Sequence, residues 1–271
     1  MPTAIGFGRS HIAMGPAASL ATLGAGLENN FTYDPQEDGR LGKLGLQARE
    51  SGLLGTTPAG IVGLHRLTVI EMKWNNDSLI SGVVPAVMFA PDSQCNPVLG
   101  HPIDKSSKVS VKVRNEDATT ITDLSPSFTL GPYPGQEEID AYKTDSDDTD
   151  DDAINRMGLS HVAIGPAAVA DLAAAAEVTY RMEINEQGRL GFLCLNIPRA
   201  LGGDIRVTSI KVDNDELLTG EVEAGKFQHD STSNPAFGHF IERQSKIDVT
   251  LRNDGAGTLP DVAPAFSLLP I

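Results

Sequence analysis

Asn76–Gly82 has the sequence NDSLISG, and Asn214–Gly220 has the sequence NDELLTG. These two segments belong to a longer internal repeat, in which residues 205–270 align with residues 67–132 without a gap. A repeat is sought before any local pattern, and a period of about half the chain is too long for the unit of a solenoid. The sequence therefore predicts two copies of one whole domain.

The repeat divides the chain of 271 residues into three parts. Upstream, with small gaps, residues 10–18 match residues 160–168. We expect a first domain over residues 1–132, a linker over residues 133–156 and a second domain over residues 157–271. Each copy is long enough to bury a hydrophobic core without a disulfide or a metal.

Apolar and polar residues alternate in several short segments of each copy, which is the pattern of half-buried strands. The clearest case is residues 108–115, repeated at residues 246–253. The same pattern occurs at residues 67–74, 177–184 and 205–212, with turn residues between the segments. Many short alternating strands indicate an all-β fold of the β-sandwich or barrel type.

Two finer predictions concern how these segments connect. Turn residues between period-two segments predict a hairpin over residues 31–46 in the first copy, and a second hairpin between residues 177–184 and 189–197. Pro166 followed by alanines is a helix-start signal, so we expect a short helix at residues 166–176. A coil packed along a sheet edge is the alternative for that segment.

The chain is strongly acidic, with a formal net charge of −15. Such a surface disfavours nucleic-acid coating, and we expect no direct sequence-specific nucleic-acid binding. Part of the charge lies in residues 145–152, which read DSDDTDDD. Calcium prefers carboxylate oxygens, but this run lacks the loop glycine and terminal glutamate of helix-loop-helix calcium sites. We interpret the run as a hydrated linker, with calcium binding as the alternative, and expect no required cofactor.

The two cysteines, Cys95 and Cys194, do not occupy equivalent positions in the two copies. We therefore expect two free thiols rather than a disulfide inherited with the duplicated fold. The start of the chain has no basic segment followed by a sustained apolar core, so no signal peptide is predicted. No apolar run approaches membrane-spanning length, and we expect synthesis in a cytoplasm.

Four histidines match in pairs across the repeat, His11 with His161 and His101 with His239. None has another histidine, cysteine or carboxylate nearby at metal-ligand spacing, so we expect structural roles. The Ser-His pairs at residues 10–11 and 160–161 lack an orienting acid and a nucleophile-elbow context. The sequence thus predicts no catalytic, cofactor-binding or metal-binding residue, and no enzyme.

This plan of two β-domains, an acidic linker and no active-site constellation resembles the double jelly-roll major capsid proteins of tailless icosahedral viruses. The chain lies near the small end of that class, like those of membrane-containing marine bacteriophages. The resemblance covers the plan of the whole chain and rests on no specific motif, so no functional residue is carried over. The two copies are more similar to each other than is usual in that class, which fits a recent duplication or a different family of tandem β-sandwiches.

The resemblance implies a structural virion protein that is made in the host cytoplasm. Three copies would give six similar domains in a ring, and these trimers would pack into a shell over an internal membrane or a genome. The implied partners are further copies of the chain, other virion proteins or the membrane. Divalent cations such as calcium would bridge carboxylates between subunits.

Two other function classes remain open. The first is an adhesion or decoration module of two β-sandwiches that binds a glycan or a protein. Aromatics make up only 5% of the chain, and we expect the single tryptophan, Trp74, to pack at the end of a strand rather than to form a sugar platform. The second is a two-cupin metal enzyme, which would need a His-x-His motif that the chain lacks. Metal bound at His101 or His239 would revive it.

Overall fold

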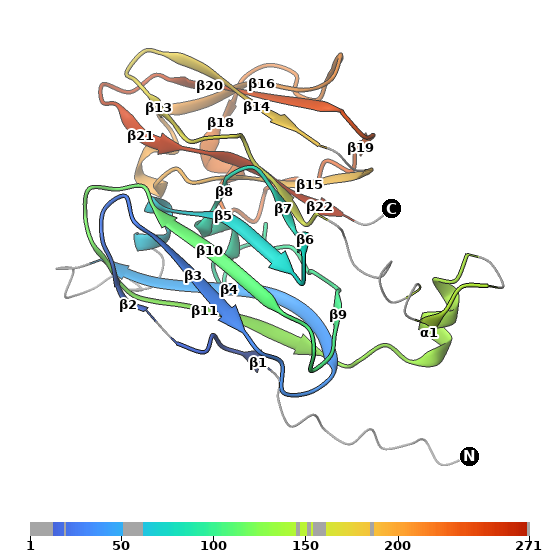
Figure 1. Cartoon of the computed structure of the whole chain (residues 1–271). Helices are drawn as coiled ribbons and strands as arrows, with labels where there is room; N and C mark the ends of the chain where they lie inside the picture. Colours follow the sequence, from blue (N-terminus) through green and yellow to red (C-terminus); the bar gives the residue numbers. More distant parts are fainter. Residues whose placement is uncertain are drawn as a thin grey trace.

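The computed structural model describes residues 13–18, 20–50, 62–144, 147–150, 153, 161–184 and 187–269. Most regular structure in these residues is strand, which confirms the all-β prediction (Figure 1). The exceptions are one α-helix and four short 3-10 turns, namely α1 (Gln136–Ala141), η1 (Val62–Arg66), η2 (Ala86–Phe89), η3 (Arg199–Leu201) and η4 (Ala224–Phe227). The predicted domain limits stay a prediction, and we refer to residues 13–131 as the N-terminal half and to residues 161–269 as the C-terminal half.

The strands of the N-terminal half form two antiparallel sheets. One has the order β1-β11-β4-β9, with β2 also on β11, and the other has the order β3-β10-β5-β6, with β8 on β5. The strands are β1 (Ala13–Met14), β2 (Leu20–Leu23), β3 (Glu28–Tyr33), β4 (Gly39–Glu50), β5 (Leu67–Trp74), β6 (Asp77–Ser78), β7 (Ile80–Ser81), β8 (Val84–Pro85), β9 (Pro102–Ile103), β10 (Val109–Asn115) and β11 (Ile121–Gly131).

The C-terminal half repeats this order. Its sheets run β19-β15-β22-β12 and β14-β20-β16-β17, with a separate β13-β21 pair and with β18 on β16. The strands are β12 (Ala163–Ile164), β13 (Ala170–Leu172), β14 (Glu177–Glu183), β15 (Gly188–Leu195), β16 (Ile205–Val212), β17 (Asp215–Glu216), β18 (Val222–Glu223), β19 (Phe240–Ile241), β20 (Lys246–Asn253), β21 (Leu259–Val262) and β22 (Pro264–Leu269).

Both predicted hairpins are wrong, because the two arms of each lie in different sheets. β14 pairs with β20, whereas β15 pairs with β22 and β19. In the same way β3 pairs with β10 and β4 pairs with β11. Tyr180 of β14 and Leu190 of β15 are buried in one hydrophobic cluster. The arms therefore face each other across the core instead of lying side by side in one sheet.

The predicted helix at residues 166–176 is also absent. Its middle is β13, a strand that pairs antiparallel with β21, so the segment is neither the predicted helix nor the coil given as its alternative. Leu172 is fully buried, and the Tyr180 hydroxyl donates to the Ala170 carbonyl. Ala175 has a positive φ of 56°, which no helix accommodates. Pairing with the sheet thus overrides the weak helix propensity of the alanines.

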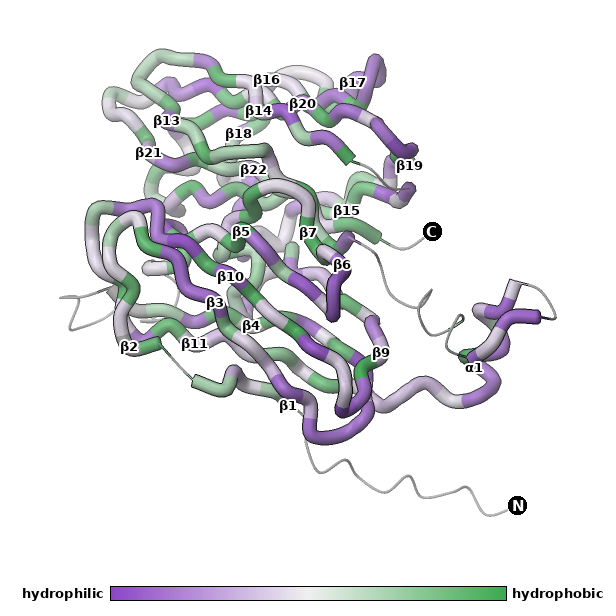
Figure 2. The backbone as a smooth tube through the Cα atoms, in the orientation of Figure 1, coloured by the Kyte–Doolittle hydropathy of each residue, from purple (hydrophilic) through white to green (hydrophobic). Residues whose placement is uncertain are grey.

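Alternation of buried and exposed residues places the core between the sheets, as the sequence pattern predicts. Val109, Val111 and Val113 of β10 are buried, and the residues between them are partly exposed. Figure 2 shows hydrophobic and hydrophilic positions alternating along the strands of both halves. The N-terminal hydrophobic cluster also contains C-terminal residues, among them Val162 and Cys194.

A short parallel ladder joins the two halves. β7 of the N-terminal half pairs with β12 of the C-terminal half, which extends the sheet β19-β15-β22-β12 across the boundary. The Val83 amide donates to the Pro166 carbonyl (2.7 Å), and the Gly165 amide donates to the Ser81 carbonyl (2.8 Å). A Cβ at Gly165 would overlap the Val83 carbonyl oxygen. Only glycine permits this approach of two backbones.

The segment between the halves contains structure that the sequence did not predict. In α1, Ile139 is buried and forms a small hydrophobic cluster with Ala153. The Lys143 ammonium lies between the carboxylates of Asp140 (2.9 Å) and Asp150 (2.7 Å). The described part of the acidic linker is therefore partly organised around one lysine. Asp145, Ser146, Asp151 and Asp152 of the acidic run lie outside the described residues.

Candidate functional site

Several repeated polar residues have the same structural task in both halves. Asn75 and Asp213 end β5 and β16 with a positive φ of 53° in each case. Their side-chain Oδ1 atoms accept hydrogen bonds from the backbone amides of Lys108 and Lys246, each at 2.8 Å. Asx residues tolerate this left-handed conformation and stabilise turns through such bonds. The repeat of these residues is therefore explained by turn geometry.

Asn115 and Asn253 tie loops to the ends of the sheets. Asn115 is buried, and its Nδ2 donates to the carbonyl oxygens of Leu23 (3.0 Å) and Thr119 (2.7 Å). The equivalent Asn253 donates to Leu172 (3.0 Å) and to a glycine carbonyl in the following loop (2.8 Å). Each asparagine thus ties a strand residue of one segment to the loop that follows its own strand, through one buried and one part-buried hydrogen bond.

Gly42 and Gly191 also have the same structural role in both halves, because each permits a shift in register between two central strands. The register of β4 against β11 shifts near Gly42, and that of β15 against β22 shifts near Gly191. At each shift a hydroxyl fills the gap, because Thr129 Oγ1 accepts from the Lys43 amide and Ser267 Oγ accepts from the Phe192 amide. A Cβ at either glycine would overlap that hydroxyl.

The three described histidines of the two pairs lie in different surroundings. His101 is buried, and its ring lies 5.1 Å from that of Trp74, whose place at the end of β5 is as predicted. The equivalent His239 is 28% exposed, with Nε2 3.9 Å from a carboxylate oxygen of Asp215. His161 is partly buried, and His11 lies outside the described residues. Among the described residues, no three His, Cys, Asp or Glu side chains are grouped to hold a metal ion.

Polar side chains that the repeat did not single out gather where the two halves meet, and we call this contact the seam. The rings of His65 and His229 approach edge to face, with centroids 5.5 Å apart. Burial, followed by the neighbouring His229, lowers the pKa of His65 to about 4. Asn196 donates from Nδ2 to the backbone carbonyl of His65 (3.3 Å) and accepts from the Ala263 amide (2.8 Å). The seam therefore keeps His65 neutral at physiological pH.

The two cysteines also meet at the seam, although they are far apart in the sequence. Cys95 and Cys194 are free thiols with 1% and 0% exposure, and Cys95 lies close enough to Cys194 to affect its ionisation. The Cys95 thiol donates to the Leu193 carbonyl (3.6 Å). Burial, together with the neighbouring Cys95, raises the pKa of the Cys194 thiol. The prediction of free thiols is confirmed, but their proximity was not predictable from positions that do not match in the repeat.

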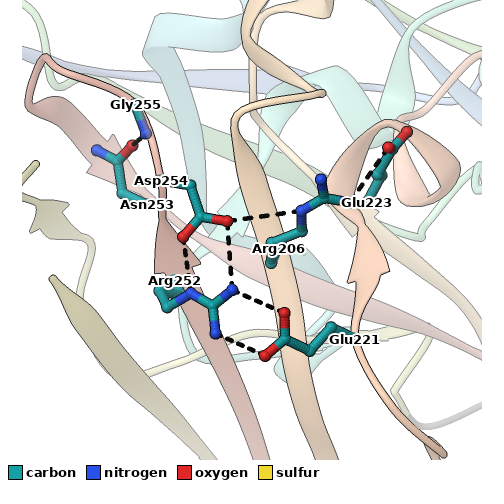
Figure 3. Close-up of polar contacts among 7 residues, drawn as sticks. All are labelled: Arg206, Glu221, Glu223, Arg252, Asn253, Asp254 and Gly255. Atoms are coloured by element: carbon teal, nitrogen blue, oxygen red, sulfur yellow. Dashed lines mark hydrogen bonds and ion pairs between the residues drawn. The ribbon is translucent and has the colours of Figure 1, made fainter. Parts of the chain in front are cut away.

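An ion-pair network covers the exposed face of the β14-β20-β16-β17 sheet. Arg252 forms two bonds to Glu221 (2.6 and 2.7 Å) and also contacts Asp254, as Figure 3 shows. Arg206 reaches Asp254 (3.6 Å) and Glu223 (3.1 Å). The bond to Arg252 lowers the pKa of the Glu221 carboxyl. Every charge in this network has an opposite partner, so it is built to fix neighbouring strands rather than to bind an ion.

Comparison with known proteins adds no identity to this geometry. No protein-family model and no curated protein matches the sequence. Within the described residues, no helix is long and apolar enough to span a membrane. The features that bear on function are therefore the duplicated strand order, the ladder between the halves and the seam.

Proposed function

We propose that the chain forms two tandem jelly rolls, over residues 1–132 and 157–271 with a linker at residues 133–156, and serves as a major capsid subunit. The strand order supports the fold. In each half there are two four-strand paths, and the chain changes sheet between β3 and β4, between β4 and β5 and between β10 and β11, as it does between their equivalents in the other half. An eight-stranded jelly roll winds in this way, in capsid proteins, lectins and cupins alike. Because this architecture serves several functions, the fold alone does not imply the shell function.

The observation that supports the shell function is that equivalent edge strands of the two halves have different pairing partners. β12 pairs with β22 and also with β7 of the other half. Its equivalent β1 pairs only with β11 among the described strands. The glycines at these edges differ between the halves in the same way. Gly82 and Gly165 are in backbone contact at the ladder, whereas a Cβ at their equivalents, Gly220 and Gly15, would meet no described atom within 4 Å.

When a contact joins two unlike surfaces, each added unit offers a surface for the next one, and the series ends only when the rotation between units closes a ring. Within each chain this contact is made once, between the surfaces at Gly82 and Gly165. The equivalent surfaces, at Gly220 and Gly15, have no such contact with described residues. Three chains joined through these open edges give six similar units in a ring. Such trimers would pack into an icosahedral shell, with other virion proteins or an internal membrane as partners, after synthesis in the host cytoplasm.

Charge and apolar exposure set the conditions for this assembly. The net charge of −15 makes the copies repel each other, and salt or calcium weakens that repulsion. Exposed large apolar side chains in the described part of the chain include Leu27, Val98, Leu201 and Phe240. We expect association to grow with ionic strength and with calcium.

The test is the mass of the purified chain in solution, by sedimentation and by negative-stain electron microscopy, at low and high salt and with and without calcium. The expected product is a trimer of three 28.7 kDa chains, about 86 kDa, or a larger closed particle. A chain that stays monomeric under all conditions rejects the shell function and favours the adhesion module.

Two glycine variants locate the interface. Gly15→Ala would place a Cβ where a neighbouring backbone has to approach, so the trimer fraction should fall while the monomer remains folded. Gly203→Ala is the matched control, because Gly203 is equally open but belongs to the turn between η3 and β16 and not to either edge segment. Equal association by the two variants would reject the edge contact even if trimers form.

A further inference from the structure

The two cysteines are brought together by the contact between the halves. Cys95 comes from the loop after η2 in the N-terminal half, and Cys194 lies in β15 of the C-terminal half. The Cys95 Sγ lies 3.6 Å from the carbonyl oxygen of Leu193, the residue before Cys194, so the two cysteines come from neighbouring backbone segments. They are the only cysteines of the chain.

The surroundings hold both backbones in place. The side-chain amide of Asn234 donates to the Cys95 sulfur (3.3 Å) and to the Leu193 carbonyl (2.7 Å), so one side chain bridges the two cysteine segments. The amide of the residue before Cys95 donates to the His229 carbonyl (2.7 Å). Cys194 is paired with Ala265 in the central ladder of its sheet. The thiols therefore stay close together while the seam is closed.

We propose that Cys95 and Cys194 are a modification site, at which a small disulfide oxidant such as oxidised glutathione converts the thiol pair into a disulfide across the seam. The inference does not depend on the shell function. One protein thiolate attacks the oxidant's disulfide and releases one glutathione thiolate, which leaves a mixed disulfide. The second protein thiolate attacks the protein sulfur of this mixed disulfide and releases the second glutathione. Two protein thiols are thus oxidised by two electrons, and the oxidant, with their two protons, becomes two glutathione thiols.

Burial controls when this reaction proceeds. The attacking species is the thiolate, and an apolar, enclosed site disfavours it. Exchange therefore requires a local opening of the seam that exposes one sulfur. A reducing cytoplasm keeps the pair as thiols, whereas an oxidising medium traps the disulfide after the seam opens. Once formed, the bond closes a loop of about 100 residues, a little over a third of the chain, and restricts the unfolded state.

The test incubates the full chain with oxidised glutathione at a series of temperatures below unfolding. The expected product is a monomer about 2 Da lighter than the reduced chain, because two protons and two electrons are lost. A non-reduced digest should contain one peptide pair linked through Cys95 and Cys194. The rate should rise with temperature more steeply than glutathionylation of a free peptide thiol, since opening of the seam limits it. The unfolding midpoint should rise by about 5–15 °C and return on addition of dithiothreitol.

The single variants Cys95→Ser and Cys194→Ser are matched controls, because each keeps one thiol in the same surroundings. Each should give only the glutathione adduct and never the lighter monomer. Three outcomes would overturn the proposal: wild-type chain that carries only glutathione adducts, chains linked only to one another, or a linked monomer with an unchanged unfolding midpoint. The wild-type measurements decide the matter even if a variant fails to fold.

Discussion

Gly165→Ala tests the ladder that joins the two halves. The added methyl would overlap the Val83 carbonyl, so the backbones must separate. Separation breaks the bonds from Val83 to Pro166 and from Gly165 to Ser81, and a third from Val162 to Leu79 lies next to them. Each buried backbone bond contributes about 1 kcal/mol net, so the variant should lose about 2–4 kcal/mol. That loss corresponds to a melting temperature about 5–15 °C lower.

Gly15→Ala is a matched control for this experiment. Gly15 occupies the equivalent position, precedes proline as Gly165 does, and has open space around its Cβ position. Both variants restrict the unfolded chain equally, so the difference between them isolates the contact. Melting should be followed by circular dichroism at low salt and low concentration, where the mass is that of one chain. Equal melting temperatures for the two variants would refute the ladder as a stabilising contact.

Three further predictions follow from the described contacts. The unfolded chain protonates His65 below pH 6.5, whereas the folded chain keeps it neutral down to about pH 4. The contribution of His65 to the free energy of unfolding therefore falls by up to about 3 kcal/mol as the pH drops through that window, and it is constant above the window. Urea midpoints should show this fall in wild type and a smaller one in His65→Gln. Asn115→Ala and Asn253→Ala should each lose about 2–3 kcal/mol in urea titrations, because buried carbonyls are left without donors, whereas the exposed Asn30→Ala should change little. Arg252→Met should lower the melting temperature slightly at low salt and not at all at about 1 M salt, since exposed ion pairs are screened; an undiminished effect at high salt would point to lost packing instead.

Local strand formation was predictable because it depends on neighbouring residues. The alternating segments at residues 67–74 and 205–212 coincide with β5 and β16. Partner choice was not predictable from turn residues, since β14 and β15 have the composition of hairpin arms but bury their apolar faces against each other. The alanine-rich segment at residues 166–176 failed for a related reason. Its backbone finds partners in β21, and helix propensity is too weak to compete with them.

The seam could not be predicted from the repeat, because the residues that form it do not match between the copies. Matching residues such as Asn75 and Asp213 do the same work twice. At the seam one half presents its β7 side and the other its β12 side, so equivalent positions face different surroundings and have no reason to match. Cys95 aligns with a serine and His229 with a proline.

Mismatched positions therefore carry the information about how the copies touch. Within a gapless repeat, a buried-type residue such as cysteine opposite a polar one marks a place where the two environments differ. Two glycines at the open edges do match, and a ring of chains would explain why. Gly15 is retained opposite Gly165, and Gly220 opposite Gly82, although neither open glycine has a described neighbour that would exclude a side chain. Gly220 also needs its positive φ of 76°, but Gly15 has no such need. An exposed glycine kept where the monomer does not require one is the expected trace of a backbone contact made with another chain.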